Sequence, residues 1–219
     1  MTKSGDATRE HLLDVAERLY GERGVAGVSL REIRTAAGSR NTAAVQFHFG
    51  DRDGLLQALV DRHMPRIAAL QQARYELMVA ESRGDDRRSL VDVLVRPTAE
   101  YLARGPQERA WVKIMADLAS LPDLHLKEML AVTPKAGLLA GAALFDQLRR
   151  AMPPRYARER LVILAQSSVH AAADYARMCD DPMESRGHLS PGAFVENLVD
   201  MTTGALFAPV SSPGADEPR

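Results

Sequence analysis

The fold of this chain is decided by residues 29–56, which read SLREIRTAAGSRNTAAVQFHFGDRDGLL. Ser29 and Glu32 form a capping-box pattern, in which each side chain bonds the backbone amide of the other, so a helix is expected to start at Ser29. Gly38 ends this short helix, because glycine adopts a left-handed helix stop without strain. Another short helix follows and ends at Gly50. Two short helices joined by a tight glycine turn predict a helix-turn-helix.

A preceding helix completes a small N-terminal unit. Apolar residues from Thr8 onward follow helical spacing until Gly24 supplies a stop, whereas residues 1–7 are polar and expected to be disordered. The third helix is expected over about 41–49. The sequence therefore predicts a three-helix domain over residues 1–50.

The third predicted helix is too short and too polar at its start to serve only as core. Its side chains are of the kinds that read base edges, because arginine suits guanine, whereas asparagine or glutamine suits adenine. These side chains are Arg40, Asn41, Thr42 and Gln46. Three amphipathic helices alone would also fit the start of a generic helical bundle, so residue pattern by itself leaves both interpretations open.

These features, in this order from Thr8 to about Leu59, resemble the DNA-binding domain of the TetR/AcrR family of bacterial regulators. The most specific stretch is residues 47–56, FHFGDRDGLL. It is similar to the family's aromatic-His-Phe-Gly ending of the recognition helix and to the fourth helix that follows. The remainder of the chain resembles the family only in architecture, as a helical body of about the usual length.

The chain departs from the family pattern at three points. The stretch between Gly38 and Phe49 is one residue longer than the commonest pattern, as in a variant branch of the family. Gln46 and Phe47 stand where tyrosines are usual, and Arg34 replaces a typically small residue. These departures affect the expected base contacts and leave the class of protein unchanged.

Several further residues of this domain are expected to contact DNA. Ser29, at a helix N-terminus, is suited to donate to a phosphate, and Arg52 resembles a family lysine that grips the DNA backbone. Ala43 permits close approach, and His48 is expected either to contact a phosphate or to bond within the domain. Aromatic residues here are more often core, with Phe49 the stronger core candidate. The expected DNA-binding set is Ser29, Arg40, Asn41, Thr42, Ala43, Gln46, Phe47, His48 and Arg52.

Composition narrows the function classes. The formal net charge is −1, and residues 1–50 carry seven basic and six acidic side chains, so one head alone would bind DNA poorly. A dimer is therefore expected. Cys179 is the only cysteine, which excludes disulfides within the chain and cysteine-rich metal clusters. Neither metal-binding spacing nor a nucleophile or phosphate-loop motif occurs, so no catalytic residue, metal or cofactor is expected and the chain is predicted not to be an enzyme.

The rest of the chain predicts helices throughout, and hence an all-α protein. A connecting helix is expected over residues 51–82, with Pro65 bending or interrupting it. Further helices are expected at about 87–104, 106–120, 123–152, 155–179 and 191–207, with kinks at Pro97 and Pro134. Residues 51–208 are predicted to form a ligand-binding and dimerisation domain, and residues 209–219 a loose tail. With no apolar signal core and no run of about 18 apolar residues, a cytoplasmic protein without membrane contact is expected.

The family resemblance implies that the body holds both a dimer interface and a ligand pocket. Apolar stripes on the last two helices suit a four-helix bundle around a two-fold axis, although both could simply pack inward. The expected interface residues are Leu161, Leu164, Ser168, Phe194, Leu198, Met201 and Ala205. Apolar and polarisable side chains in the middle helices suit an adaptable cavity, although each alone is more often core. The expected pocket residues are Ile67, Tyr101, Trp111, Met115, Phe145 and His170.

Together these patterns predict a homodimeric transcriptional regulator that binds double-stranded operator DNA. The expected behaviour is that of a repressor released from a palindromic operator by a small, largely apolar ligand. The alternative is a helical protein–protein adaptor without effector control. The polar start of the recognition helix, Arg40-Asn41-Thr42 with Gln46, favours the DNA-binding interpretation.

Overall fold

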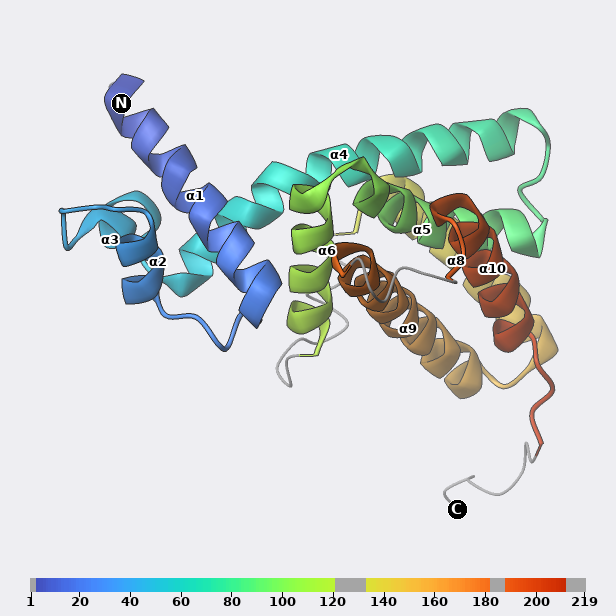
Figure 1. The fold of residues 1–219 in the computed structure, drawn as a ribbon. Coiled ribbons are helices and arrows are strands. Elements are labelled where there is room, and N and C mark those ends of the chain that lie inside the picture. The colour runs from blue at the N-terminus through green and yellow to red at the C-terminus, as the bar shows by residue number, and fades with distance from the viewer. Residues whose placement is uncertain (1–2, 121–132, 182–187, 212–219) are drawn as a thin grey trace, which may run out of the picture.

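The structure is a computed structural model that describes residues 3–120, 133–181 and 188–211. Every regular element within these ranges is a helix, as the sequence predicts. A head of three short-to-medium helices lies at one end of the molecule, and the long helix α4 extends from it along the helical body (Figure 1). None of the described helices is long and apolar enough to cross a membrane.

The head consists of α1 (Lys3–Arg23), α2 (Leu30–Ala36) and α3 (Ala44–Phe49). Helix α1 begins at Lys3. The expectation that residues 1–7 are disordered is therefore wrong for residues 3–7. Asp6 stabilises this first turn, because a carboxylate is favourable at the positive end of the helix dipole. The helix ends at Gly24, whose φ of +79° is the predicted left-handed stop.

Helix α3 is shorter than the sequence pattern indicates, because Asn41 does not join it. The side-chain Oδ1 of Asn41 accepts a hydrogen bond of 3.0 Å from the Ala43 amide, which holds a turn ahead of the helix. Asparagine favours such local side-chain bonds over a helix interior. The glycine stops at Gly38 and Gly50 are confirmed by φ angles of +64° and +78°.

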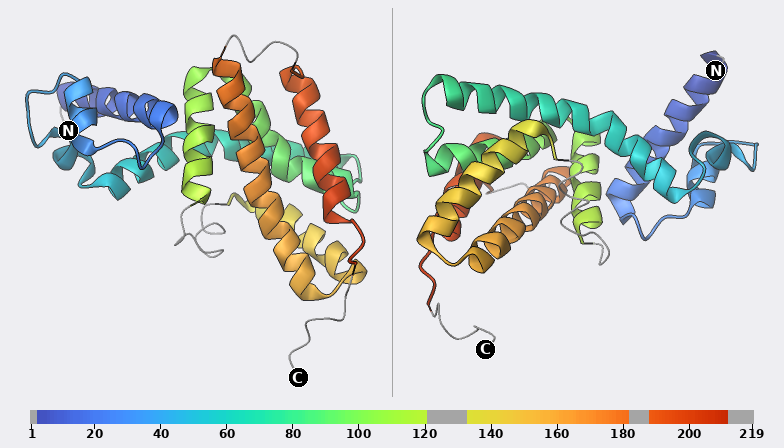
Figure 2. Two further views of the ribbon diagram at one scale, coloured as in Figure 1. Left: turned by 60° about the horizontal axis from the view of Figure 1, so that its bottom comes forward. Right: turned by 180° about the vertical axis from the view of Figure 1, so that it is seen from behind.

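Helix α4 (Arg52–Ala80) connects head and body, and Figure 2 shows it spanning both parts. Asp51 caps its start by accepting a 2.9 Å bond from the Gly54 amide. The helix is not interrupted at Pro65, although proline supplies no amide to the carbonyl of Asp61 one turn earlier.

The body contains α5 (Arg87–Tyr101), a 3₁₀ turn (Leu102–Arg104), α6 (Pro106–Ala119), α8 (Lys135–Ala151), α9 (Pro154–Asp180) and α10 (Pro191–Leu206). The expected kink at Pro134 is wrong, since this proline immediately precedes α8. Pro97 lies buried inside a continuous α5. The first part of the helix expected over 123–152, and residues 212–219 of the expected tail, lie outside the described residues.

Two apolar cores hold the molecule together, and the first of them crosses from head to body. It joins α1, α2 and α3 to α4, α6 and α9 through buried side chains such as Leu12, Ile33 and Trp111. The second lies within the body, between α5, α8, α9 and α10. The backbones of α1 and α6 approach closely, since a Cβ added at Gly21 would lie 2.6 Å from the Cβ of Ala110. Head and body therefore share one packed core at their boundary.

Candidate DNA-binding surface

Helix α3 and the turn before it divide their side chains between the head core and the solvent. Ala44, Val45 and Phe49 are buried, which fixes α3 against α1 and α4. The remaining side chains of this stretch form what we call the reading surface. Its exposed residues are Arg40, Asn41, Thr42, Ala43, Gln46 and Phe47. The structure therefore brings together six of the nine residues that the sequence predicts to contact DNA.

Phe47 distinguishes the reading surface from an ordinary polar helix face. Its side chain is 78% exposed, whereas Phe49, two residues later, is 8% exposed and belongs to the core. His48 is half-buried between them, and its ring meets the Phe47 ring edge-on at a centroid distance of 5.0 Å. One exposed ring does not make an apolar patch, so Phe47 is of interest only together with the exposed polar side chains around it.

Ser29 lies at the start of α2, where the predicted capping box is confirmed. Its hydroxyl accepts from the Glu32 amide at 3.2 Å and donates to the Glu32 carboxylate at 2.8 Å. Arg23 donates to the same carboxylate at 2.7 Å. The bond from Arg23, followed by the bonds from Ser29, lowers the pKa of Glu32 from 4.5 to about 2. The serine proton expected for a phosphate is therefore already used inside the head.

Arg52 does not project from the head as a phosphate-gripping side chain would. Its Nη1 donates to the carbonyl of Val25 at 2.7 Å, and its Nη2 donates to the carbonyl of Val28 at 2.7 Å. The half-buried guanidinium thus fastens the α1–α2 connector to the start of α4. Because the arginine fork satisfies two carbonyls at once, we assign Arg52 a structural role in place of the expected DNA contact.

Glu17 and His63 form a buried polar cluster that sequence reasoning missed as a site. Glu17 is 1% exposed, and its Oε1 lies 2.7 Å from Nε2 of His63, which has no exposed surface. A charged residue on the apolar face of α1, in helical register with Leu13 and Tyr20, was the signal that could have found it. Among the described residues, no group of three or more metal-ligating side chains forms.

Five of the six residues expected to line a ligand pocket are divided between the two apolar cores. Ile67, Tyr101 and Trp111 are buried in the first core, with Met115 packed against it. Phe145 packs against the second core. His170 on α9 is half-buried, with Nε2 3.4 Å from the Ser120 hydroxyl.

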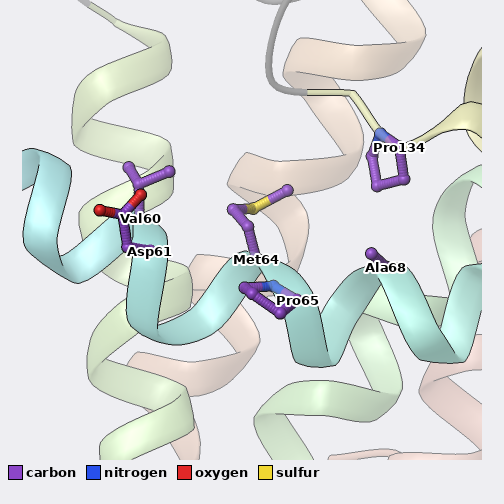
Figure 3. Close-up of a pocket in the computed structure, with 6 residues that line it drawn as sticks. All are labelled: Val60, Asp61, Met64, Pro65, Ala68 and Pro134. Atoms are coloured by element: carbon purple, nitrogen blue, oxygen red, sulfur yellow. The ribbon is translucent and has the colours of Figure 1, made fainter.

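A different set of residues lines an open apolar groove of about 480 Å³ beside α4. The groove follows the turns of α4 around Pro65, with Pro134 facing them from the start of α8 (Figure 3). Its lining residues are Val60, Asp61, Met64, Pro65, Ala68 and Pro134.

The structure separates the expected dimer residues into three groups. Leu164 and Leu198 are buried inside the protomer, so they cannot face a partner. Leu161, Ser168 and Phe194 are half-buried; the Phe194 ring stacks on Tyr175 at a centroid distance of 4.0 Å. Met201 and Ala205 are exposed, as expected for an interface. Ile163, which the sequence stripe omitted, is 58% exposed on the outer face of α9.

The comparisons with known proteins agree with the arrangement of the head. A family model for bacterial regulatory proteins of the tetR family matches residues 12–59. The chain is 35% identical over 88 residues to the HTH-type transcriptional regulator AcrR of Shigella flexneri. This match covers 40% of the chain and 39% of the length of that relative.

Two solved structures are similar along most of the chain but at low identity. Salmonella enterica GusR aligns with a TM-score of 0.45 and 17% identity, over 92% of this chain and 96% of that one. A TetR-family transcriptional regulator from Pectobacterium atrosepticum aligns with a TM-score of 0.40 and 19% identity, over 94% of each chain. Residues 12–59 therefore match the tetR family of bacterial regulatory proteins, and the chain spans about two fifths of the length of its AcrR relative.

Proposed function

We propose that this protein is a transcriptional regulator that binds operator DNA through the reading surface of α3. The observation that carries the proposal is the exposure of Gln46 and Phe47 on α3, and of Arg40 in the turn before it, while the opposite face of α3 is fixed in the core. Arginine and glutamine offer donors and acceptors to base edges, and an aromatic ring suits a thymine methyl group. We assign the protein no enzymatic activity.

A homodimer is the proposed functional unit. The weakly charged head makes one copy a poor DNA binder, and two copies add their contacts on a two-fold symmetric site. The outer faces of α9 and α10 support this, because Ile163 and Met201 are 58% and 60% exposed. Gly204 and Ala205 beside Met201 permit close approach of a second copy. Equivalent contacts of the two heads should lie about 34–36 Å apart on DNA.

Release by a small apolar molecule is the proposed mode of regulation, with the protein acting as a repressor. The open groove beside Pro65 supports this proposal through its mostly apolar lining, which suits an apolar molecule. It lies on α4, the helix that joins the groove to the head. A ligand that prefers another angle of α4 would shift the protein away from its DNA-binding form.

Selection from random double-stranded DNA, followed by mobility-shift titration, tests the DNA-binding proposal. We expect a palindromic site, and Gln46→Ala should lose about 1–3 kcal/mol of discrimination at one base position. Gln72→Ala is the matched control, because Gln72 is an exposed glutamine on α4 away from the reading surface. Failure to enrich any sequence would favour the adaptor interpretation.

Sedimentation of charge-inserting variants tests the dimer. Ile163→Glu and Met201→Glu should give monomers, because each would place a charge in the proposed interface. Val79→Glu is the matched control, since Val79 is 53% exposed at the far end of α4. A dimer that persists in both interface variants would place the two-fold axis elsewhere.

A further inference from the structure

Helix α6 contacts the head at three points along its length. Near its start, the Gln107 side chain donates to Oε2 of Glu17 at 3.0 Å. In its middle, Ala110 packs so closely on Gly21 that no side chain would fit there. Near its end, Asp117 Oδ2 accepts a 3.0 Å bond from the Val25 amide in the α1–α2 connector. The head is therefore held along α6 as well as through its covalent continuation into α4.

Glu17 is the most buried charged group among these contacts. Arg62 of α4 donates to Oε2 of Glu17 at 2.9 Å, beside the bond from Gln107 of α6. The other carboxylate oxygen faces His63 of α4 at 2.7 Å. One carboxylate of the head is thus bound by groups from both helices that adjoin the head.

His63, the histidine that faces Glu17, connects this carboxylate to side chains of the body. His63 Nδ1 lies 2.8 Å from the Tyr101 hydroxyl at the end of α5. Its ring stacks on Trp111 of α6 at a centroid distance of 4.9 Å and an interplanar angle of 7°. Both rings are fully buried, so the side of His63 that faces Glu17 has little freedom to move.

A buried carboxylate costs free energy unless hydrogen-bond donors satisfy its oxygens. Rotation of the head away from α6 would break two hydrogen bonds at once: the bond from Gln107 to Glu17 and the bond from the Val25 amide to Asp117. Such a rotation leaves a buried charge incompletely satisfied, so intermediate angles are disfavoured. The head therefore has one preferred angle, defined by α6 and not only by bending of α4 near Pro65.

We propose that Glu17 is a positioning residue, which fixes the angle of the reading surface by anchoring α1 to α6 and α4. The consequence for DNA rests on the proposed function, because two heads must enter successive grooves at the same time. A head with a loosened angle would still touch DNA, but two such heads would rarely fit one palindromic site together.

Glu10 provides a matched control for Glu17. Both carboxylates lie on α1 and bind Arg62, at 2.7 Å for Glu10 and 2.9 Å for Glu17. Glu10 is exposed and is bonded only to Arg9 and Arg62 in the described structure, whereas Glu17 also reaches Gln107 of α6. Replacement of each by glutamine therefore separates loss of an exposed charge that pairs with Arg62 from loss of the buried charge that Arg62 and Gln107 both bind.

The test measures the head–body distance directly, without DNA. Nitroxide labels are attached at Thr35→Cys in α2 and Arg149→Cys in α8, in a Cys179→Ser background. Pulsed electron paramagnetic resonance then measures the distance between the two labels within one chain, after dilution with unlabelled protein. We expect one narrow distance distribution for the parent protein and for Glu10→Gln, and a broadened or shifted one for Glu17→Gln. A narrow distribution in Glu17→Gln, or equal broadening in Glu10→Gln, would overturn the proposal.

Gln107→Ala keeps the test decisive if Glu17→Gln does not fold. Gln107 is exposed, so its loss removes the bond to Glu17 without opening the core. The distance distribution of this variant should also be broadened or shifted relative to that of the parent protein. A distribution as narrow as the parent's would again overturn the proposal.

A second readout connects the angle to DNA. Glu17→Gln should lose about tenfold or more in affinity for a selected palindrome, yet bind a single half-site as the parent does. Equal loss on both DNA sites would mean that Glu17 shapes the reading surface itself, and would overturn the positioning role. If the parent protein selects no DNA, the proposed function fails, while the distance measurement still decides whether Glu17 fixes the head.

Discussion

The head has two polar regions that are built in opposite ways. The reading surface around α3 leaves Arg40, Gln46 and Phe47 exposed to solvent. The region where α1 meets the body buries Glu17 against His63 of α4 and surrounds the pair with donors and rings. A buried polar group needs its partners inside the same chain, whereas an exposed one is available to another molecule. The contrast separates groups that hold the head from groups available to a partner.

Arg52 shows why residue type alone does not separate the two kinds of region. Like Arg40 it is an arginine beside the predicted recognition helix, but its two terminal nitrogens are occupied by the carbonyls of Val25 and Val28. The following substitutions test the contrast, in decreasing order of their expected effect on the free energy of unfolding.

The largest effect is expected for Arg62→Ala in the buried region. Arg62 binds Glu10, Asp14 and Glu17, and its removal leaves the buried Glu17 carboxylate short of its charged donor. We expect a loss of about 3–5 kcal/mol in the free energy of unfolding, measured by urea denaturation at fixed protein concentration. Arg18→Ala, which breaks only the exposed pair with Glu22, should cost about 0.5 kcal/mol or less. Equal costs for the two variants would contradict the contrast.

Arg52→Ala is expected to lower the free energy of unfolding by about 1–3 kcal/mol, because two carbonyls of the connector lose their donor. Arg52→Lys should restore only part of this loss, since an ammonium group lacks the planar fork of arginine. Denaturation together with DNA titration at several salt concentrations measures both roles. A stable Arg52→Ala variant with a reduced salt dependence of DNA binding would instead support a phosphate contact.

Ser29→Ala is expected to cost about 1 kcal/mol, because α2 loses its N-terminal cap. Ser29→Asp should recover only part of this loss, since aspartate caps helices well but cannot donate to the Glu32 carboxylate or to a phosphate. Thermal unfolding measures the cap, and DNA titration measures the phosphate role. If Ser29→Asp is stable yet binds DNA much more weakly than Ser29→Ala, then repulsion of a nearby phosphate identifies Ser29 as part of the DNA-binding surface.

The carboxylate of Glu32 adds a pH dependence to this cap. Its pKa in the folded protein is about 2, below its usual value of 4.5, because Arg23 and Ser29 bond the ionised form. The contribution is fully present above pH 4.5 and is lost as the pH falls toward 2. The parent protein should therefore be more stable than Glu32→Gln at pH 5. This difference in the free energy of unfolding should become smaller as the pH falls to 3. A difference that stays constant over this range would contradict the assignment.

The smallest effect on folding is expected for Phe47→Ala. The ring is 78% exposed, so its removal should change the free energy of unfolding by less than about 0.5 kcal/mol. Affinity for the selected operator should fall nevertheless, because the ring is available to DNA. Phe49→Ala is the matched control and should destabilise the head by about 3–5 kcal/mol, since Phe49 belongs to the core. Unchanged operator affinity in Phe47→Ala would remove Phe47 from the reading surface.

Local features of the head could be predicted because they depend on residues close in sequence. The capping box of Ser29 and Glu32 and the glycine stops at Gly24, Gly38 and Gly50 are confirmed. Each depends on a side chain or a backbone preference within a few residues, so no knowledge of distant segments was needed. The resemblance of residues 12–59 to the tetR family likewise rests on the order of these local features.

The sequence by itself thus determined the helical class, the helix-turn-helix and most of the reading surface. Only the tertiary structure decided that Leu198 packs inside the protomer, that Arg52 binds the connector, and that Glu17 meets α6. A periodic pattern shows which face of a helix is apolar but not which neighbour covers it. The partner of a polar side chain likewise depends on residues that are distant in sequence, and these come together only when the helices pack.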